Sequence, residues 1–424
     1  MKTHHKRQTR PFFNNRLLLP LTITAVLYNT AACSETPTVS TDNRVTTSES
    51  SNYVATDIDS RTPSNDLKPS FTTQTIATFS EPWAMTALPT DMSDTSESQK
   101  LFVTQKTGEL FIVDIVTGAK TAVTGVPKVA YGGQGGLGDI ILAPDFATTH
   151  TVYMSYVEAG NSSTFGAKVI KAQLIGLETA SPSLQSITPI WQQTPKVKGQ
   201  GHYSHRLLFS PDGRYLYISS GDRQKQDPAQ DMNVNLGKII RLNPDGSIPV
   251  DNPYADNTDI SRQFWSTGHR NILGMSFDDS GKLWAHEMGP RGGDEFNLIE
   301  KGQNYGWPTV SNGRNYSGID IPDHDTRPEF MAPKISWTPV ISPSAISFYP
   351  SGANSDFPTW QGHALISGLS SKALIVVAMD NEQAVERYRY DMNERIRSVL
   401  TVSGQVFLLE DGAGGRLLKL LPSE

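Results

Sequence analysis

Short runs of alternating or uniformly apolar residues recur from about Ser70 onward, and each run is bounded by Gly, Pro, Asp or Asn. Runs of this length, rich in aromatic and β-branched residues, predict β-strands. No long amphipathic helical pattern competes with them. The folded part of the chain is therefore expected to be all-β. Examples are KLFVTQ, GELFIVDI, TVYMSYV, YLYISSGD, KLWAHE, ALIVVAMD and QVFLLED.

One phrase, a turn followed by a strand, returns at wide and similar intervals. Pro144 and Pro211 are 67 residues apart, Asp212 and Asp279 are again 67 apart, and the phrase returns 124 residues after Asp279. This period predicts a six-bladed β-propeller with long loops in residues 69–424. A large β-sandwich or barrel is the alternative, although its turns would be closer together and less regular. The phrase occurs as LAPDFATTHTVYMSY, FSPDGRYLYISSGD, FDDSGKLWAHEMG and TVSGQVFLLEDG.

The first 68 residues have a different composition. Residues 1–33 contain a basic stretch, an apolar run from Leu17 to Tyr28 and then small residues. This order is typical of a secretory signal peptide, and the apolar run is too short to span a bilayer comfortably. Residues 34–68 are rich in Ser, Thr, Asp and Asn, which predicts a flexible, disordered tether that cannot bury enough apolar surface to fold alone.

Cys33 is the only cysteine, so no intrachain disulfide can form. It follows Ala31 and Ala32 in a pattern that resembles the lipobox of bacterial lipoproteins, with Thr30 where that family usually has Leu. We favour a lipidated Cys33 that anchors an exported protein at the periplasmic face of a membrane. Ordinary signal cleavage near Ala32 is the alternative. The formal net charge of −6, without a basic stripe, gives no indication of a nucleic-acid partner.

Four polar clusters lie beside the predicted strands. The first two place Gln134 among glycines, and His202, His205 and Arg206 before a strand that Asp222 follows. A histidine suits general-base chemistry near neutral pH, but two loop histidines are also compatible with a purely polar loop or a transition-metal pair.

The third cluster is the densest and lies between Gly268 and Pro308. Its arginines suit a carboxylate-bearing ligand, and its carboxylates and loop carbonyls suit calcium. A solvated loop with internal ion pairs is the alternative. In the fourth cluster, Arg395 and Arg397 point to one face of a strand near Asp411, which indicates an anion or carboxylates opposite them, or else an exposed edge strand. The polar residues of the third cluster are His269, Arg270, Asn271, Arg291, Asp294, Glu295 and Asn297.

Taken together and in order, these segments resemble the soluble PQQ-dependent aldose (glucose/sorbosone) dehydrogenases from about Pro82 to Leu421. The resemblance implies a six-bladed propeller with pyrroloquinoline quinone (PQQ) over its central axis and a calcium ion on the quinone. It also implies that an aldose is oxidised at its anomeric carbon to the lactone, with electrons passing to an external acceptor. The segments that carry it are GGQGGLGDIILAPDF, HYSHRLLFSPDG, LGKIIRLNPDGSIPVDNP, GHRNILG, GPRGGDEFNLIEKGQNYGWP, SPSAISFY and RIRSV.

The resemblance also implies roles for individual residues. His202 is expected to be the general base. The carbonyls of Gly289 and Pro290 are expected to hold the active-site calcium, and Glu295 and Tyr305 a second, structural calcium. The expected cofactor-site and pocket residues are Gln134, Asp222, Arg270, Asn271, Arg395, Arg397 and Asp411.

The chain departs from the family pattern in three places, and each departure removes a polar group near the cofactor. Ile272 and Leu273 stand where many members have Pro-Gln, and Met288 stands where they have His or Gln. Ser370 replaces a lysine, with Lys372 two residues on. A lipid-tethered PQQ- or ligand-binding propeller that has lost the redox step is therefore the second hypothesis. A calcium-dependent propeller hydrolase such as a lactonase ranks last, because its site needs several side-chain oxygens on the axis.

Overall fold

The computed structural model describes residues 68–89, 99–257, 260–352 and 355–423. In these residues the strands form six antiparallel sheets, which confirms the predicted all-β, six-bladed propeller. The predicted signal peptide and, apart from Lys68, the predicted tether lie outside the described residues. No described helix is long and apolar enough to cross a membrane.

Five of the blades follow one another along the chain, and the sixth combines strands from both ends. From the inner strand outward, the first blade contains β2 (Pro82–Ala87), β3 (Lys100–Gln105), β4 (Leu110–Asp114) and β5 (Lys120–Val123), and the second contains β6 (Leu137–Leu142), β7 (Thr151–Ala159) and β8 (Thr164–Ile175), which pairs with both β9 (Ser183–Gln192) and β10 (Val197–Lys198). The third blade contains β11 (Ser204–Phe209), β12 (Leu216–Ser220), β13 (Lys238–Leu242) and β14 (Phe264–Thr267), and the fourth contains β15 (Ile272–Phe277), β16 (Leu283–Glu287), β17 (Asp294–Ile299) and β18 (Ile335–Trp337). The fifth blade contains β19 (Pro343–Phe348), β20 (Ala364–Gly368), β21 (Ala373–Asp380) and β22 (Gln383–Asp391), and the sixth contains β23 (Ile396–Val402), β24 (Gln405–Glu410), β25 (Ala413–Pro422) and β1 (Phe71–Ser80). The helical pieces are the single turn α1 (Phe146–Thr149) and the short 3-10 turns η2 (Asn161–Ser163), η3 (Asp227–Ala229), η4 (Ser261–Gln263), η5 (His324–Thr326) and η6 (Pro358–Trp360).

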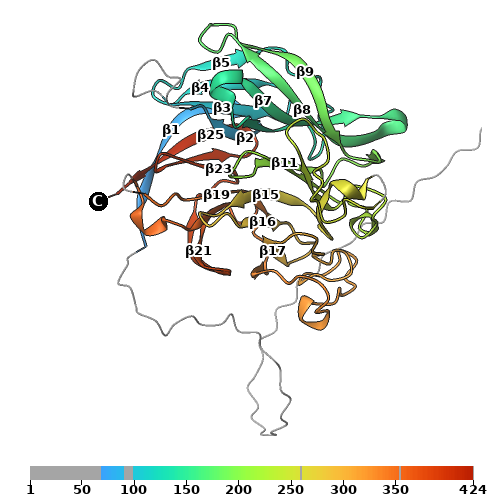
Figure 1. Cartoon of the computed structure of the whole chain (residues 1–424). Coiled ribbons are helices and arrows are strands. Elements are labelled where there is room, and N and C mark those ends of the chain that lie inside the picture. The colour runs from blue at the N-terminus through green and yellow to red at the C-terminus, as the bar shows by residue number, and fades with distance from the viewer. Residues whose placement is uncertain (1–67, 90–98, 258–259, 353–354, 424) are drawn as a thin grey trace, which may run out of the picture. The chain divides into compact units, whose positions relative to one another are not determined.

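The first described strand closes the ring. β1 pairs antiparallel with β25, from Phe71 opposite Pro422 to Ser80 opposite Ala413, so the outer strand of the last blade comes from the other end of the chain. Figure 1 shows this closure as blue β1 beside red β25. The inner strands contact one another in the order β2, β6, β11, β15, β19, β23 and back to β2. The six inner strands therefore surround one central axis.

The apolar core lies between neighbouring blades, and this explains the nearly continuous apolar runs in the sequence. Successive side chains of a strand point to opposite faces of its sheet. Phe102 of β3 packs with Met154 in the next blade, whereas Leu101 and Val103 pack with Phe407 in the preceding blade. Because both faces of a blade are covered, a middle strand is apolar at nearly every position rather than at every second one.

Each of the six inner strands has a register irregularity near its beginning. Such bulges twist a strand and re-aim its side chains. We call the residues at these irregularities the bulge layer; they are Trp83, Gly138, Asp139, His205, Arg206, Leu273, Ser344 and Arg397.

Side-chain hydroxyls from the second strand of a blade satisfy the backbone N–H groups at four of these bulges. Ala84 N–H donates to Thr104 at 3.0 Å, and Asp139 N–H donates to Ser155 at 2.8 Å. The hydroxyls of Ser219 and Ser367 accept in the same way from Arg206 and Ala345. In the blade that begins with β15, His286 stands opposite the bulge in place of a hydroxyl residue. Both ring nitrogens of His286 are buried and have no hydrogen-bond partner among the described residues.

The strand directions decide where a site can form. Because the first two strands of each blade are antiparallel, the inner strand begins at the same end of the axis at which the second strand ends. Residues just before the inner strands and just after the second strands therefore meet at that end. This set includes Glu81, Lys106, Gln134, Tyr203, Asn271, Met288, Ser342, Leu369, Arg395 and Asp411.

Candidate active site

A cavity of about 450 Å³ lies among these strand ends. Five of the residues expected from the sequence line it: Gln134, Asn271, Arg395, Arg397 and Asp411. A larger hollow of about 660 Å³ lies against β7, β8 and β9, and none of the expected site residues lines it. We therefore assign the candidate site to the smaller cavity. Its other lining residues are Glu81, Trp83, Lys106, Gly133, Tyr203, Ser204, His205, Leu273, Met288, Ser342, Leu369 and Gly412.

His202 lies just before β11 and is held on two sides. Its Nδ1 is 2.7 Å from Oδ1 of Asp222, and its backbone N–H donates to Oε1 of Gln134 at 2.6 Å. Its φ of +48° is in the left-handed region, which non-glycine residues seldom adopt unless their surroundings hold them there. The structure thus brings together three residues that are far apart in the sequence and that the resemblance had grouped.

Asp222 is fully buried and accepts hydrogen bonds from other donors besides the ring of His202. Trp307 donates its indole N–H to Oδ2 at 2.8 Å, and the backbone N–H groups of Gln224 and Gln226 donate at 2.8 and 3.2 Å. Burial alone would raise the pKa of Asp222, but the bond from His202 and these further donors lower it. An ionised Asp222 can only accept, so the proton of the His202 ring resides on Nδ1 and the Nε2 lone pair is free.

The charge state of His202 follows from its surroundings. Burial is the largest influence and lowers the pKa of His202, the bond to Asp222 opposes this, and the charge of Arg270 lowers it further. The imidazole is consequently neutral at neutral pH. A neutral histidine with an oriented Nε2 can accept a proton, which is the chemistry of a general base.

Arg270 and Asn271 connect this dyad to the next blade. The peptide N–H of Arg270 donates to Glu287 at 2.6 Å, and its Nη1 donates to the carbonyl of Met288 at 2.7 Å. The Nε of Arg270 is buried and has no partner among the residues that the structure describes. Asn271 accepts a hydrogen bond from Ser204 at 3.2 Å. A buried guanidinium donor left unpaired costs free energy, so the position suits a ligand that brings an acceptor.

On the other side of the cavity, two arginines share one carboxylate. Arg395 and Arg397 each donate through Nε to Asp411 at 2.8 Å. Lys106 is paired with Glu81 at 3.0 Å. Three cations therefore face two carboxylates, and the cavity carries a surplus of positive charge. Such a surplus suits an anionic ligand, and guanidinium groups are well shaped for carboxylates.

The lysine position that departs from the family pattern contributes nothing to this charge. Lys372 is exposed and donates to the carbonyl of Asn393 at 2.9 Å, and Ser370 donates to the carbonyl of Val340 at 3.3 Å. Neither residue lines the cavity. Lys106, which the sequence analysis missed, does line it. A signal was available, because Lys106 follows the repeated second strand KLFVTQ just as Met288 and Asp411 follow theirs.

An apolar cluster forms one wall of the cavity. Leu273 packs with Trp83 and Ala84, and Met288 packs against them. The sulphur of Met288 is 3.8 Å from Nδ2 of Asn271. The two departures from the family pattern thus combine into one apolar surface, which could contact a planar ring system. Sequence reasoning gave no role to Trp83 or Tyr203, whose positions became evident only from the strand ends.

The predicted metal ligands lie in two places. The Gly289–Pro290 loop follows β16, and its Gly289 N–H donates to Asp294 at 2.8 Å. A Cβ at Gly289 would lie 2.3 Å from the carbonyl oxygens of Gly292 and Gly293, so only glycine fits there. Among the described residues, no donor bonds to the carbonyls of Gly289 or Pro290, so both carbonyls are available to a cation.

Glu295 and Tyr305 belong to a second, more buried group. Glu295 lies opposite Glu287 on neighbouring strands, and burial followed by the charge of Glu287 raises its pKa well above the usual range. Asn297 donates to Glu295 at 3.1 Å, while its own Oδ1 is buried and has no partner in the described part of the chain. Nε2 of His324 is 3.2 Å from the Tyr305 carbonyl, and Nδ1 is 4.0 Å from Glu295. Two buried carboxylates and an unpaired amide oxygen are a donor set that suits a divalent cation such as calcium.

No group of three or more His, Cys, Asp or Glu side chains suited to a metal occurs in the described part of the chain. A cation at either place would therefore have to draw on backbone carbonyls or amide oxygens. Calcium accepts such mixed oxygen ligands readily.

Comparison with known proteins gives concordant matches. The family model described as "Glucose / Sorbosone dehydrogenase" matches residues 79–419. The chain is 36% identical over 353 residues to the aldose sugar dehydrogenase YliI of Escherichia coli K12, covering 80% of this chain and 90% of that protein. The apo-form crystal structure of the soluble E. coli aldose sugar dehydrogenase matches with a TM-score of 0.75 and 33% identity, over 84% of this chain and 100% of that one. The PQQ-bound form of aldose sugar dehydrogenase from Streptomyces coelicolor matches with a TM-score of 0.68 and 26% identity, over 84% and 99% of the two chains.

Proposed function

Since the chain belongs to the glucose/sorbosone dehydrogenase family, we propose that it is a quinoprotein that oxidises the anomeric carbon of aldose sugars with PQQ as its cofactor. The observation that carries the proposal is the His202–Asp222 dyad beside a cavity with surplus positive charge. A neutral base and an anion-binding cavity are what this reaction requires from the protein.

The cavity residues fit PQQ, which is planar and has three carboxylates. Arg395 and Arg397 line the cavity and would hold carboxylates there. Arg270, the chain neighbour of the lining residue Asn271, would offer its unpaired Nε to an acceptor. The apolar wall of Trp83 and Leu273 would contact the ring system. When bound, PQQ supplies the acceptor for the two electrons and the hydrogen that leave the sugar carbon.

The protein's own part is proton transfer and orientation. Nε2 of His202 takes the proton of the anomeric hydroxyl, while Asp222 keeps the other ring nitrogen protonated and stabilises the imidazolium that forms. Gln134 fixes the backbone of the base. Loss of this proton and of the C1 hydrogen, which the cofactor would accept with two electrons, would make the anomeric carbon a carbonyl, so the proposed product is the lactone.

Calcium is the second proposed cofactor. The free carbonyls of Gly289 and Pro290 would hold one ion next to Arg270 and Met288. Glu295 and the carbonyl of Tyr305 would hold the other, which would balance the buried carboxylates. A cation at the first position would stabilise negative charge that develops in the cavity.

The apolar wall favours one second candidate, a propeller that binds PQQ or another anionic ligand without turnover. Leu273 and Met288 place carbon and sulphur atoms in the cavity where many family members have polar groups. If this candidate binds PQQ, titration should give binding heat without sugar-dependent reduction of the cofactor; if it binds another anionic ligand, titration with PQQ should give no heat.

The location of the protein is also proposed from its first residues. The basic and apolar stretches before Cys33 support export and a lipid anchor at the periplasmic face, and the external electron acceptor would then be reached there. The intact mass of membrane-extracted protein tests the anchor, because lipidation adds acyl mass to a chain that begins at Cys33.

The function is tested by reconstitution with PQQ and calcium, followed by dye reduction with a panel of aldoses. His202→Ala should lower kcat by at least a thousandfold while PQQ still binds. His150→Asn, at the end of α1 and outside the cavity, serves as the control and should keep full activity. No turnover of any aldose by the PQQ-loaded parent protein would contradict the enzyme proposal.

A further inference from the structure

We propose that Arg206 is a positioning residue for the cofactor cavity: its guanidinium joins the strands of the bulge layer around the axis and fixes the apolar wall of the cavity in which PQQ would bind. The inference rests on the proposed function for the identity of the ligand. Within the described part of the chain, Arg206 makes no hydrogen bond to His202 or Asp222 and does not line the cavity.

The contacts of the Arg206 guanidinium extend to four other blades. Nε donates to the carbonyl of Leu273 at 2.6 Å, and Nη2 donates to the carbonyl of Ser344 at 3.0 Å. Nη1 is 3.5 Å from Asp139. The guanidinium carbon also lies 3.9 Å from the ring centre of Trp83. These partners belong to β15, β19, β6 and β2, so Arg206 of β11 contacts four other inner strands.

The remaining inner strand is reached through Ser344. Its hydroxyl donates to the carbonyl of Arg397 at 2.7 Å, and Arg397 donates back through Nη1 at 3.3 Å. Arg397 is one of the two arginines that face Asp411 in the cavity. Ser344 therefore links the guanidinium of Arg206, at the centre of the bulge layer, to Arg397, which lines the cavity.

Two of the partners of Arg206 are also parts of the cavity wall. Trp83 and Leu273 line the cavity, as do the chain neighbour His205 and Arg397, which is reached through Ser344. The ring of His205 stacks on Trp83 with centroids 4.9 Å apart and an interplanar angle of 11°. Arg206 thus fixes the backbone beneath Leu273 and packs against the ring of Trp83, both of which belong to the apolar wall.

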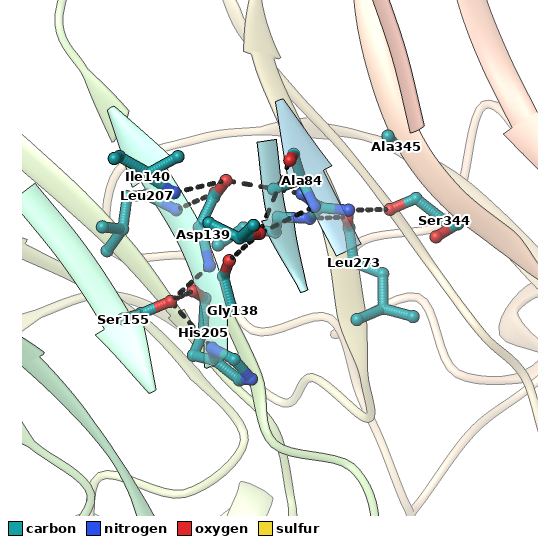
Figure 2. A network of polar contacts seen from close by, with 12 residues as sticks. Ala84, Gly138, Asp139, Ile140, Ser155, His205, Leu207, Leu273, Ser344 and Ala345 are labelled. Atoms are coloured by element: carbon teal, nitrogen blue, oxygen red, sulfur yellow. Dashed lines mark hydrogen bonds and ion pairs between the residues drawn. The ribbon is translucent and has the colours of Figure 1, made fainter. Parts of the chain in front are cut away.

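Asp139 compensates the buried charge and is itself held in place. Its Oδ2 accepts from the backbone N–H of Leu207 at 2.9 Å, and its Oδ1 accepts from that of Ile140 at 3.2 Å. Figure 2 shows Asp139 facing Leu207 and Ile140, with Leu273 and Ser344 on the far side of the same network. A buried cation and carboxylate held by further hydrogen bonds favour one arrangement of the backbone over others.

Hydroxyl groups extend this order between blades. Thr104 donates to the carbonyl of Gly138 at 2.7 Å, Ser155 to that of His205 at 2.7 Å, and Ser219 to that of Ile272 at 3.2 Å. Each of these hydroxyls also accepts from a bulge N–H of its own blade. These hydroxyls therefore form a continuous hydrogen-bonded arc from the β2 blade to the β15 blade, and the guanidinium of Arg206 spans the centre of the layer.

The experiment compares Arg206→Lys with the matched control Arg214→Lys. Lysine keeps a charge near Asp139, but its single nitrogen cannot serve Asp139, Leu273 and Ser344 together. Arg214 is on the same blade but is 71% exposed and pairs with Asp212 at the surface, so its replacement should change nothing measured here.

Two measurements are made on each variant. In the apo protein, amide exchange should accelerate at least tenfold at residues 83–84, 273–274 and 344–345, while β13 and β21 exchange as in the parent. In the PQQ-loaded protein, the Kd for PQQ should rise about tenfold and the absorption spectrum of the bound cofactor should shift, with the sugar KM within twofold of the parent. A less ordered apolar wall lowers the affinity for PQQ, because part of the binding free energy is then used to order the wall.

Parent-like exchange together with parent-like PQQ affinity in Arg206→Lys overturns the inference. If that variant does not fold, Arg206→Gln combined with Asp139→Asn leaves no unpaired buried charge, and the same changes are expected of it. If the parent protein binds no PQQ, the proposed function fails. The amide-exchange data on the apo protein still decide whether Arg206 orders the apolar wall.

Discussion

Replacing Asp222 by Asn tests the dyad with little change of shape. The carboxylate accepts from the His202 ring, the Trp307 indole and two backbone N–H groups. An asparagine amide has one acceptor oxygen and one donor nitrogen, so it cannot satisfy all four donors. If its nitrogen faces His202, the ring must accept at Nδ1 and carry its proton on Nε2, where the base is needed.

The expected loss of kcat is about 10³–10⁴-fold, the size of effect known when an orienting aspartate behind a catalytic histidine is replaced by Asn. This corresponds to about 4–5.5 kcal/mol of transition-state stabilisation at about 1.36 kcal/mol per tenfold. Leaving one buried donor unpaired should also lower the free energy of unfolding by about 1–3 kcal/mol.

The assay is dye reduction at saturating PQQ and aldose, with PQQ affinity and Tm measured on the same preparation. Asp212→Asn is the matched control, because Asp212 lies on the same blade with a side chain 48% exposed, and it should keep parent kcat. A kcat for Asp222→Asn within tenfold of the parent, with PQQ bound, would refute the assignment of Asp222 as the group that orients the base.

Four further predictions follow from individual groups. Burial holds the pKa of His202 below its usual 6.5, so kcat/KM should stay constant through neutral pH and fall only once the pH drops below about 6.5 and the base is protonated. Burial also lowers the pKa of His205 to about 3; the unfolded chain takes up this proton first, so the free energy of unfolding should fall by up to about 1.4 kcal/mol per pH unit from pH 6.5 towards 3, seen as a slope that His205→Gln reduces. Arg397→Gln leaves Asp411 with one arginine and should weaken PQQ binding by at least tenfold in calorimetry, without a comparable change in sugar KM. Chelation of calcium should lower Tm in the parent by several degrees and much less in Glu295→Gln, and equal shifts in both would contradict a calcium site at that residue.

The fold was largely predictable because each repeat has a recognisable local pattern of turn residues and apolar residues. Turn-and-strand phrases recur at propeller spacing, and the covered faces of each blade produce apolar runs such as YLYISS and ALIVVA. The closure of the ring could not be predicted in the same way, because the pairing of Phe71 with Pro422 joins distant segments without a local signal.

The candidate site was predictable as a set of residues but not as an arrangement. The resemblance grouped Gln134, His202 and Asp222, and the structure brings them within hydrogen-bonding distance. The donation from Trp307 and the cavity position of Lys106 depend on where neighbouring strands end in space. Reasoning about single motifs could not reach them.

The role of the bulge layer is a third feature that the sequence alone could not reveal. The hydroxyls of Thr104, Ser155, Ser219 and Ser367 occupy equivalent positions in the repeated second strands, and this recurrence was present in the sequence. Their significance emerges only when the irregular registers of the inner strands are known.

The most direct test of the account is a single-turnover experiment on the PQQ- and calcium-loaded protein, in which the absorbance of the bound cofactor is followed after mixing with an aldose carrying either hydrogen or deuterium at C1. The account predicts reduction of the cofactor by at least one aldose, slowed severalfold by deuterium and abolished in His202→Ala. A bound cofactor whose spectrum no aldose changes would contradict it.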